Sequence, residues 1–566
     1  MKQNAFLLVV LFLTGCAGQM PPPGGPVDTV PPEIVNTIPS HLALGFEGNS
    51  IRFEFSEYVE KRSAEEAIFI SPDIPEKEFS WSGRELRISF PGRLRDSTTY
   101  VVTVGNDVSD LRNRNKMSEA FTLAFSTGDK IDRGSIQGAV VLDNTAERQG
   151  ITLFAYQLDL TDVDTLDPRS HKPHFMTQTN RAGQFKLSYL PFGMYRVYAV
   201  KDEYRNLLYD PEVDMYGVFH KDMMLTEQDT LFADFRVRMT IEDTTGVRLI
   251  KGEAVSRSLV QFEFSEDIDT TSLMKSHITI EDTLAVASIG IHQLYPLPLS
   301  RKTFAMVTDV LEEDKGYRLS VDHVTDVTGN RINLSASSIT FTGSGQRDTI
   351  APMIHSFSIT DSSRNVGLSD TLAIYWNKAP YILPVLSYTS LKDSAKRDIP
   401  YKMVWQNGAT ILLIPNKELL PKMKYQLRII TKGFEDFSGN KAQDTAHIRT
   451  FETIDIETLS EISGKVVDKK SSSVRKSEMI VVAMRVDRTP VSSSSIKASS
   501  DKTYVHKNLQ EGKYSLWVFE DIASQTTYDH GKVFPFRYSY RFSERMDTLT
   551  LRARWPIDGF DLEIAE

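Results

Sequence analysis

The chain has 566 residues, a formal net charge of −10 at pH 7 and a single cysteine. At about 100 to 200 residues per domain, this length predicts three to five modules rather than one core. Nucleic-acid-binding proteins usually carry an excess of basic residues, whereas this chain is mildly negative, so we expect no nucleic-acid partner. One cysteine excludes a disulfide framework and a cysteine-based metal site.

The first residues have the composition of an export signal. Lys2 precedes a short apolar run over residues 5–13, and the sequence Leu13-Thr14-Gly15-Cys16 follows. The run is too short to span a bilayer. A basic start, a brief apolar core and small residues before a cleavage site are typical of a secretory signal.

With the small Gly15 directly before Cys16, this segment resembles the lipobox of bacterial lipoproteins. The resemblance implies a signal peptide over residues 1–15, cleavage between Gly15 and Cys16, a diacylglycerol on the Cys16 sulfur and acylation of the new amino terminus. Two or more acyl chains anchor a protein stably, so the expected partner is a membrane, held through the amino-terminal lipid. The alternative is an ordinary signal peptide with an incidental cysteine.

Residues 16–27 are rich in proline and glycine and predict a semi-extended tether. At about 3.1 Å per residue, such a tether lifts the first module roughly 30 Å from the lipid. No acidic cluster follows Cys16. In Bacteroidota-type lipoproteins such a cluster marks surface export, so the resemblance implies an outer-membrane protein that faces the periplasm rather than the cell surface.

A first repeat appears after the tether. Residues 51–57 (IRFEFSE) recur as residues 260–266 (VQFEFSE) and more loosely as residues 372–378 (LAIYWNK). Apolar residues alternate with polar ones in the first two copies, which predicts half-buried strands.

Each copy continues with the same order of features. A leucine precedes a tyrosine by a constant spacing, a turn that begins with aspartate follows, and a strand with phenylalanine closes the unit. The pairs are Leu94 and Tyr100, Leu311 and Tyr317, and Leu419 and Tyr425; the turns begin at Asp110, Asp326 and Asp436; the closing strands contain Phe125, Phe341 and Phe451. The sequences Asp-Thr-Val-Pro-Pro at residues 28–32 and Asp-Thr-Ile-Ala-Pro at residues 348–352 precede two of the copies.

These features together resemble the SbsA-type bacterial Ig-like domain, at residues 28–129, 243–345 and 349–455. The tyrosines resemble the tyrosine corner of Ig-like sandwiches, in which the phenol oxygen makes a hydrogen bond to the backbone a few residues upstream.

A second repeat fills the remaining length. Phe185, Leu190, Gly193 and Tyr195 align without a gap with Tyr504, Leu509, Gly512 and Tyr514. The pattern resembles the carboxypeptidase-regulatory-like, transthyretin-type β-sandwich, at residues 132–238 and 459–566. The predicted fold class is therefore all-β, with tandem antiparallel β-sandwiches, three Ig-like and two transthyretin-like. The whole layout resembles Bacteroidota lipoproteins that carry an amino-terminal Ig-like domain.

Several acidic residues are candidates for a cation site. Glu57 and Glu266 occupy equivalent strand ends, but the third copy has Lys378 there. This charge reversal argues against a shared acid function and favours a structural or solvated role. The stretches 159–167 and 202–212 also concentrate carboxylates. The first lacks the glycine turn and final glutamate of an EF-hand loop, and the second has Tyr204 and Leu208 where a calcium loop favours oxygen donors or a backbone ligand, so we interpret both as acidic surface loops rather than calcium sites.

No catalytic constellation is recognisable. His171 and His174 have a chelating spacing but flank Lys172-Pro173 in an expected loop. The chain has no zinc-protease helix, phosphate loop or nucleophile elbow. We therefore expect no catalytic residue, no metal ligand and no cofactor, and a protein that is not an enzyme. Trp376 and Trp517 lie in alternating strands and are expected in cores, whereas Trp81 and Trp405 near turns leave open a sugar-stacking role.

These patterns favour a non-enzymatic, lipid-anchored cell-envelope protein that acts as a multi-domain spacer or protein-binding scaffold. The alternative is a lipoprotein that binds the cell wall or a polysaccharide. The expected partner besides the membrane is therefore an unknown envelope protein or a glycan. A hydrolase is a third possibility, but the five units leave no unassigned stretch long enough for a catalytic module.

Overall fold

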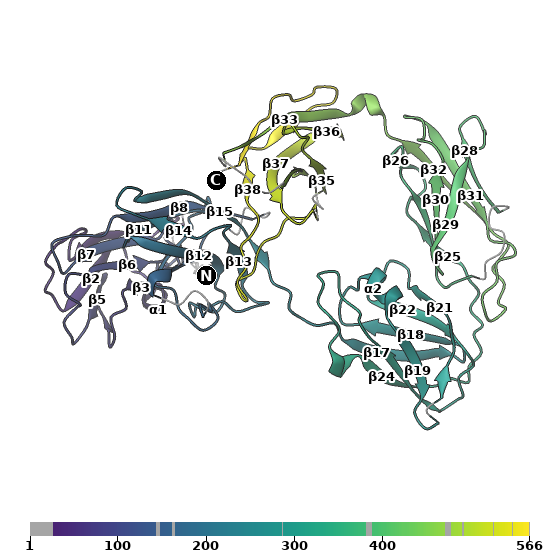
Figure 1. Ribbon diagram of the computed structural model, residues 1–566, viewed down its shortest axis with the longest axis horizontal. Coiled ribbons are helices and arrows are strands. Elements are labelled where there is room, and N and C mark those ends of the chain that lie inside the picture. The colour runs from purple at the N-terminus through teal and green to yellow at the C-terminus, as the bar shows by residue number, and fades with distance from the viewer. Residues whose placement is uncertain are drawn as a thin grey trace, which may run out of the picture. The chain divides into compact units, whose positions relative to one another are not determined.

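The computed structural model describes residues 27–142, 148–160, 165–285, 287–380, 388–469, 477–488, 492–524, 526–545 and 547–564. The predicted signal peptide and nearly all of the tether, including Gly15 and Cys16, lie outside these residues. Strands dominate the described chain, whose two α-helices, α1 (Lys61–Glu66) and α2 (Thr270–Lys275), are short (Figure 1). The predicted all-β class of tandem sandwiches is confirmed.

The chain divides into two compact units. One consists of Met1–Tyr209, Lys221–Met239 and Val533–Pro535, and the other of Asp210–His220, Thr240–Lys532 and Phe536–Glu566. Among the described residues, no helix has the length and apolarity needed to cross a membrane.

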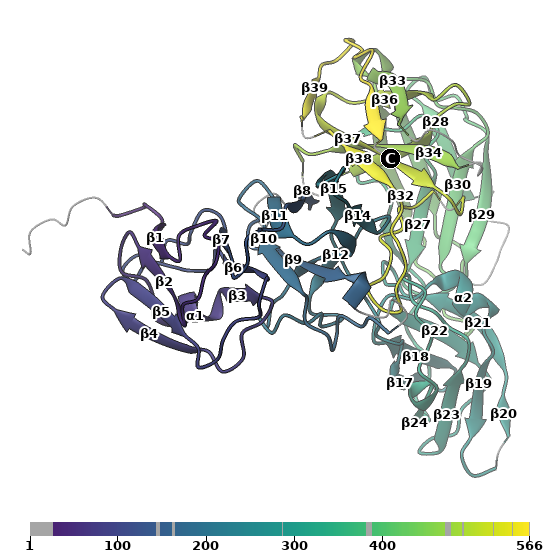
Figure 2. The ribbon, with the colours of Figure 1, turned by 60° about the vertical axis from the view of Figure 1, so that its left-hand side comes forward.

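The first Ig-like module packs one sheet against another, as Figure 2 shows. One sheet has the order β1 (Ile34–Ile38), β2 (Ser50–Phe55), β5 (Glu85–Ser89), β4 (Glu78–Ser82), and the other the order β3 (Ile68–Ser71), β6 (Thr99–Val104), β7 (Phe121–Ser126). The predicted alternation along β2 is confirmed, because Ile51, Phe53 and Phe55 are fully buried while Arg52 and Glu54 are partly exposed. Phe53 lies opposite Leu86 of β5, so both strands supply the same core.

The second and third Ig-like modules repeat this strand order, and each adds one edge strand to the second sheet. In the second, the sheets are β17 (Leu249–Ser256), β18 (Leu259–Phe264), β22 (Thr303–Thr308), β21 (Ile291–Pro296) and β20 (Ser288–Ile289), β19 (Ile278–Asp282), β23 (Gly316–Val321), β24 (Ser338–Thr342). In the third, they are β25 (Ile354–Phe357), β27 (Leu372–Trp376), β30 (Thr410–Pro415), β29 (Tyr401–Asn407) and β26 (Ser363–Val366), β32 (Ala446–Thr453), β31 (Lys424–Ile430), β28 (Thr389–Asp393).

The tyrosine corner predicted for each Ig-like module is confirmed. The phenol oxygens of Tyr100, Tyr317 and Tyr425 accept hydrogen bonds of 2.8 to 2.9 Å from the backbone N–H five residues upstream. Each ring is buried and stacks on the phenylalanine of the closing strand, at 5.5 to 5.8 Å between ring centroids. The repeated leucine–tyrosine spacing therefore marks the same local structure three times.

The two modules of the second repeat also share a topology. In each, the first strand lies between an antiparallel strand and a later parallel one, in the orders β11 (Gln184–Leu190), β8 (Gly134–Val141), β15 (Leu231–Arg238) and β36 (Thr503–Leu509), β33 (Ser460–Asp468), β40 (Leu562–Ile564). The facing sheets contain β10 (Phe175–Gln178), β9 (Thr152–Gln157), β12 (Gly193–Lys201), β14 (Met223–Leu225) and β35 (Ser492–Lys497), β34 (Glu478–Arg485), β37 (Gly512–Asp521), β38 (Phe542–Glu544), β39 (Leu549–Leu551).

The aligned tyrosines of this repeat make equivalent hydrogen bonds. Tyr195 and Tyr514 are buried, and each donates a hydrogen bond of 2.8 Å to the carbonyl four residues upstream, at Pro191 and Gln510. The gapless sequence match therefore reflects two copies of one sandwich. The short strands β13 (Met215–Val218) and β16 (Thr240–Ile241) pair with each other in the second unit.

Candidate functional site

A carboxylate organises the turn near the end of each Ig-like module. Asp326 Oδ1 accepts hydrogen bonds of 2.8 Å from the backbone N–H groups of Thr328 and Asn330. Asp436 Oδ1 accepts the corresponding bonds from Ser438 and Asn440 at 2.9 Å. The backbone N–H groups of a tight turn have no backbone acceptor nearby, and the carboxylate of the aspartate accepts their hydrogen bonds instead.

In the first module the same turn is one residue longer. Asp110 accepts four backbone N–H groups, from Arg112 through Asn115, at 2.5 to 3.0 Å. Although burial alone would raise the pKa of Asp110, these four donors hold it below its ordinary value.

The asparagine of each turn reaches back to the segment that precedes the first strand of the module. Its side-chain amide donates to a backbone carbonyl, from Asn115 to Asp28 at 3.0 Å, from Asn330 to Asp243 at 2.9 Å and from Asn440 to Asp348 at 3.0 Å. These bonds place an aspartate from before each module beside an aspartate from near its end. The role of these preceding aspartates was not apparent from the sequence, where Asp243 lies outside any repeated proline motif.

A third charged side chain joins this pair at the end of an early strand. In the second module, Glu266 follows β18, and carboxylate oxygens of Asp243, Glu266 and Asp326 all lie within 4.8 Å of one another. Burial raises the pKa of the Glu266 carboxyl, and the negative charges of Asp243 and Asp326 raise it further. Within the described residues, this is the one group of three potential metal-binding side chains that converges so closely.

The first module carries the same three residue types at the same places. Burial raises the pKa of Glu57, and the charges of Asp110 and Asp28 add to the shift. We refer to the three groups, Asp28–Glu57–Asp110, Asp243–Glu266–Asp326 and Asp348–Lys378–Asp436, as the first, second and third junction clusters.

The third junction cluster contains a cation of its own. Lys378 Nζ donates to the carboxylate of Asp348, to Asp436 Oδ2 at 2.7 Å and to the carbonyl oxygen of Ile350 at 2.8 Å. Lys378 is only 6% exposed and Asp436 5%. From the sequence, the change from glutamate to lysine at this position argued against a role shared by the three copies. In the structure, the lysine lies among the equivalent carboxylates, so all three copies place a charged side chain at the same junction.

The other sequence candidates have structural roles. His174 Nδ1 accepts a hydrogen bond of 3.0 Å from the backbone N–H of Gln157, and His171 Nδ1 lies 3.1 Å from the carbonyl of Asp167. Asp202 accepts the N–H groups of Asn206 and Leu207, so this carboxylate holds its own loop. Part of the other acidic stretch, residues 161–164, lies outside the described residues.

The tryptophans divide as the sequence predicted. Trp376 and Trp517 are buried in cores, at 0% and 7% exposure. Trp81 and Trp405 are half-buried and pack against cores, and Trp81 also donates to Glu65. Trp555 is 70% exposed.

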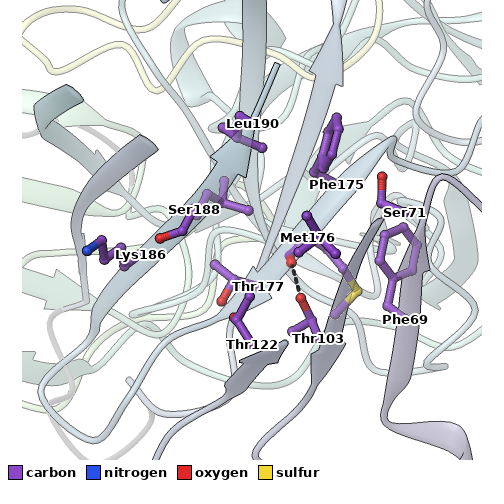
Figure 3. A pocket seen from close by; sticks show the side chains of 12 residues that line it. Phe69, Ser71, Thr103, Thr122, Phe175, Met176, Thr177, Lys186, Ser188 and Leu190 are labelled. Atoms are coloured by element: carbon purple, nitrogen blue, oxygen red, sulfur yellow. Dashed lines mark hydrogen bonds between the residues drawn. The ribbon is translucent and has the colours of Figure 1, made fainter. Parts of the chain in front are cut away.

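Among the described residues, hollows of about 10, 50 and 850 Å³ occur where the first Ig-like module meets the following sandwich within the first unit. Figure 3 shows the smallest of these, in which Thr103 donates to the carbonyl oxygen of Met176 across the junction. Its volume of about 10 Å³ matches roughly one water molecule, so it is a packing seam. The largest is an open groove of about 850 Å³ whose lining includes Leu42, Asp132, Tyr189 and Phe192.

The groove tyrosine is held in place by a histidine. His41 Nδ1 accepts the backbone N–H of Ala124 at 3.2 Å, so His41 Nε2 carries the proton when the ring is neutral and donates to the Tyr189 hydroxyl at 2.8 Å. Burial lowers the pKa of His41, which favours this neutral form.

Comparison with known proteins identifies part of the chain. Residues 28–127 and 348–453 match the family of bacterial Ig-like domains, so the Ig-like assignment of the first and third copies is confirmed. The second copy has the same order of its shared strands and the same tyrosine corner. No curated protein matches the sequence.

Solved structures show distant similarity. The amino-terminal part of the bacterial S-layer protein SbsC is 13% identical, with a TM-score of 0.17, over 37% of this chain and 44% of that one. The chain thus spans under half of that S-layer fragment. The major pilin subunit BcpA of Bacillus cereus is 10% identical, with a TM-score of 0.14, over 77% and 99%. An L,D-transpeptidase from Mycobacterium smegmatis is 14% identical, with a TM-score of 0.14, over 37% and 90%.

Proposed function

We propose that this protein is a non-enzymatic cell-envelope lipoprotein, anchored to the outer membrane through Cys16, whose sandwiches form a spacer or protein-binding scaffold. The observation that carries the proposal is the sequence Leu13-Thr14-Gly15-Cys16 after a short apolar run, with Cys16 as the only thiol of the chain. A proline-rich tether and a series of small β-modules follow.

The contacts of the described side chains support a scaffold. The carboxylates of Asp110, Asp326 and Asp436 bind their own turns, and the candidate histidines bind backbone groups. Exposed strand edges and loop ends remain as the surfaces where a protein partner adds a strand or docks. We propose that the amino-terminal lipid holds this string at the periplasmic face of the membrane.

The anchor is tested by fractionating cells that produce the wild type or Cys16→Ala. We expect the wild type in the outer-membrane fraction and the variant in the soluble fraction, because acyl chains supply the attachment. Protease added to intact cells then separates the two orientations, since a periplasm-facing protein stays protected. Recovery of both proteins in the soluble fraction would refute the anchor.

The scaffold function is tested by crosslinking intact cells, purifying the protein and identifying its neighbours. Specific recovery of the same envelope protein with wild type, at a reduced level with Cys16→Ala, is the expected outcome. Recovery of no envelope component under conditions that capture a known lipoprotein complex would contradict it.

The groove in the first unit favours one alternative, binding of a cell-wall or other exported polysaccharide. Its aromatic residues Tyr189 and Phe192 lie near the carboxylates of Asp129, Asp132 and Glu227, which is a suitable combination for sugar stacking and hydroxyl recognition. Retention on purified peptidoglycan or exported polysaccharide that falls at least tenfold with Phe192→Ala would support this alternative. Equal retention of variant and wild type would exclude the groove as the binding site.

A further inference from the structure

We propose that the second junction cluster, Asp243, Glu266 and Asp326, binds a Ca²⁺ ion that ties the start of the second Ig-like module to its turn. The inference goes beyond the anchor and scaffold proposed above and does not depend on either. It rests on the convergence of three carboxylates and on a comparison between the copies of the repeat.

The third module provides that comparison, because a cation is present among its equivalent residues. Asp348 and Asp436 correspond to Asp243 and Asp326, and both bind the ammonium group of Lys378. The lysine occupies the chain position of Glu266. One copy therefore supplies the positive charge covalently, while another supplies a third carboxylate at the same point.

The second cluster has the ligand chemistry of a hard divalent cation. Ca²⁺ takes six to eight oxygen ligands, often carboxylates and backbone carbonyls completed by water. Besides three carboxylates, the chain offers Thr328 Oγ1, which lies 3.4 Å from Asp243 Oδ2. The carbonyl of Thr245 is equivalent in sequence to that of Ile350, which accepts from Lys378 in the third copy.

The local charge balance also favours a cation. The groups acting on Glu266 are the carboxylates of Asp243 and Asp326, the Ser265 hydroxyl, which donates to Glu266 Oε1 at 3.3 Å, and the ammonium of Lys302, which binds the carbonyl of Ser265 at 3.4 Å. Three close carboxylates without a bound ion repel one another. A divalent cation removes this repulsion, as Lys378 does for two carboxylates in the third module.

The position of the cluster indicates what the ion does. Asp243 lies in the segment ahead of β17, the first strand of the module, whereas Asp326 begins a turn near its end. An ion shared by both therefore fixes the preceding segment to the body of the module and stiffens the string at this point.

The test uses the full chain, purified in detergent, and calorimetric titration with CaCl₂ and, separately, MgCl₂. Extracellular modules bind Ca²⁺ with dissociation constants of about 10⁻⁴ to 10⁻³ M, which sets the concentration range. Glu266→Lys copies the third module and is expected to fold and to bind one Ca²⁺ fewer per chain than the wild type. Lys378→Glu copies the second module and is expected to bind one more.

These differences remain interpretable whether or not the first cluster also binds an ion, since it is unchanged in both variants. An equal number of bound Ca²⁺ ions in wild type and Glu266→Lys overturns the proposal, as does the absence of binding by the wild type at 10 mM, roughly ten times the weaker constant. If Lys378→Glu fails to fold, the comparison of wild type with Glu266→Lys decides alone. Both results are independent of Cys16 and of any protein partner.

Discussion

At the residue scale, the side chain that follows β2, β18 or β27 in the three Ig-like modules sets the charge of its junction. Glu57 and Glu266 have raised pKa values, whereas Lys378 binds two carboxylates. Although burial alone would raise the pKa of Asp436, Lys378 and Asn440 hold it below its ordinary value. The three modules thus use one backbone arrangement with opposite charges at one position.

Replacing Lys378 with methionine should destabilise the third module by about 3–5 kcal/mol at pH 7, because two buried carboxylates lose their cation. The sign of the pH dependence follows from the lowered pKa of Asp436. Its stabilising contribution is present above the unfolded value of 3.8 and is lost as pH falls through the lower folded value, so the deficit of Lys378→Met should shrink below about pH 4.

Hydrogen exchange of peptides from β31 at pH 7 and pH 3.5 measures this effect within the full chain. Lys392→Met is the matched control, since Lys392 is 40% exposed and pairs with the exposed Asp398. The control should cost less than about 1 kcal/mol. A deficit of equal size in the two variants would contradict a special role for Lys378.

Tyr100→Phe should destabilise the first module by about 1–3 kcal/mol, because the N–H of Arg95 loses its acceptor in a part-buried site. Tyr58→Phe is the control, since Tyr58 is 61% exposed in the same module. Exchange of peptides from β6 reports both variants. No difference between them would show that the corner bond contributes nothing.

The two residue-scale features differ in how far the sequence predicts them. The tyrosine corner joins residues only five apart, so a constant spacing reveals it three times. The junction clusters join residues as far apart as Asp243 and Asp326, and only the closed sandwich brings these together. The sequence identified Glu57, Glu266 and Lys378 as equivalent but gave no indication of the carboxylates that surround them.

At the element scale, the alternation of apolar and polar residues predicted the strands of the second Ig-like module. It did not predict that the outer face of one of its sheets is also buried. In β18, Val260, Phe262 and Phe264 point into their own core, as expected. Leu259, Tyr295, Ala305 and Val307, from the sheet of the second module, belong instead to the core cluster of the third. Tyr295 is 1% exposed, and burial strongly raises its pKa.

Val307→Asp should therefore loosen the packing of the second module on the third, with a cost of about 3–5 kcal/mol, because an unpaired charge would be buried. Thr340→Asp is the matched control, because Thr340 is exposed on β24 of the same module. We expect faster hydrogen exchange in peptides from β29 for Val307→Asp only. Unchanged exchange in β29 would show that this face does not couple the two modules.

At the scale of the whole molecule, the tandem β-sandwich architecture could be predicted because each repeat carries its own internal spacing. The sequence could not predict the shared core of the second and third modules, since apolar residues on an outer face look like ordinary strand residues until a neighbour covers them. The lipid anchor also belongs to this scale, and it remains a prediction from residues 1–16.

The single thiol provides a direct test of that prediction. If Cys16 carries a thioether-linked lipid, denatured protein extracted from membranes has no free thiol and should not react with a maleimide-linked polymer. A variant with Gly15→Asp, which removes the small residue before the cysteine, should keep a free thiol and shift on a gel by one polymer unit. Because the chain contains one cysteine in 566 residues, no other side chain can produce this shift. Full modification of the wild type would show that the Cys16 sulfur is free and that the protein is held in the envelope, if at all, by its modules.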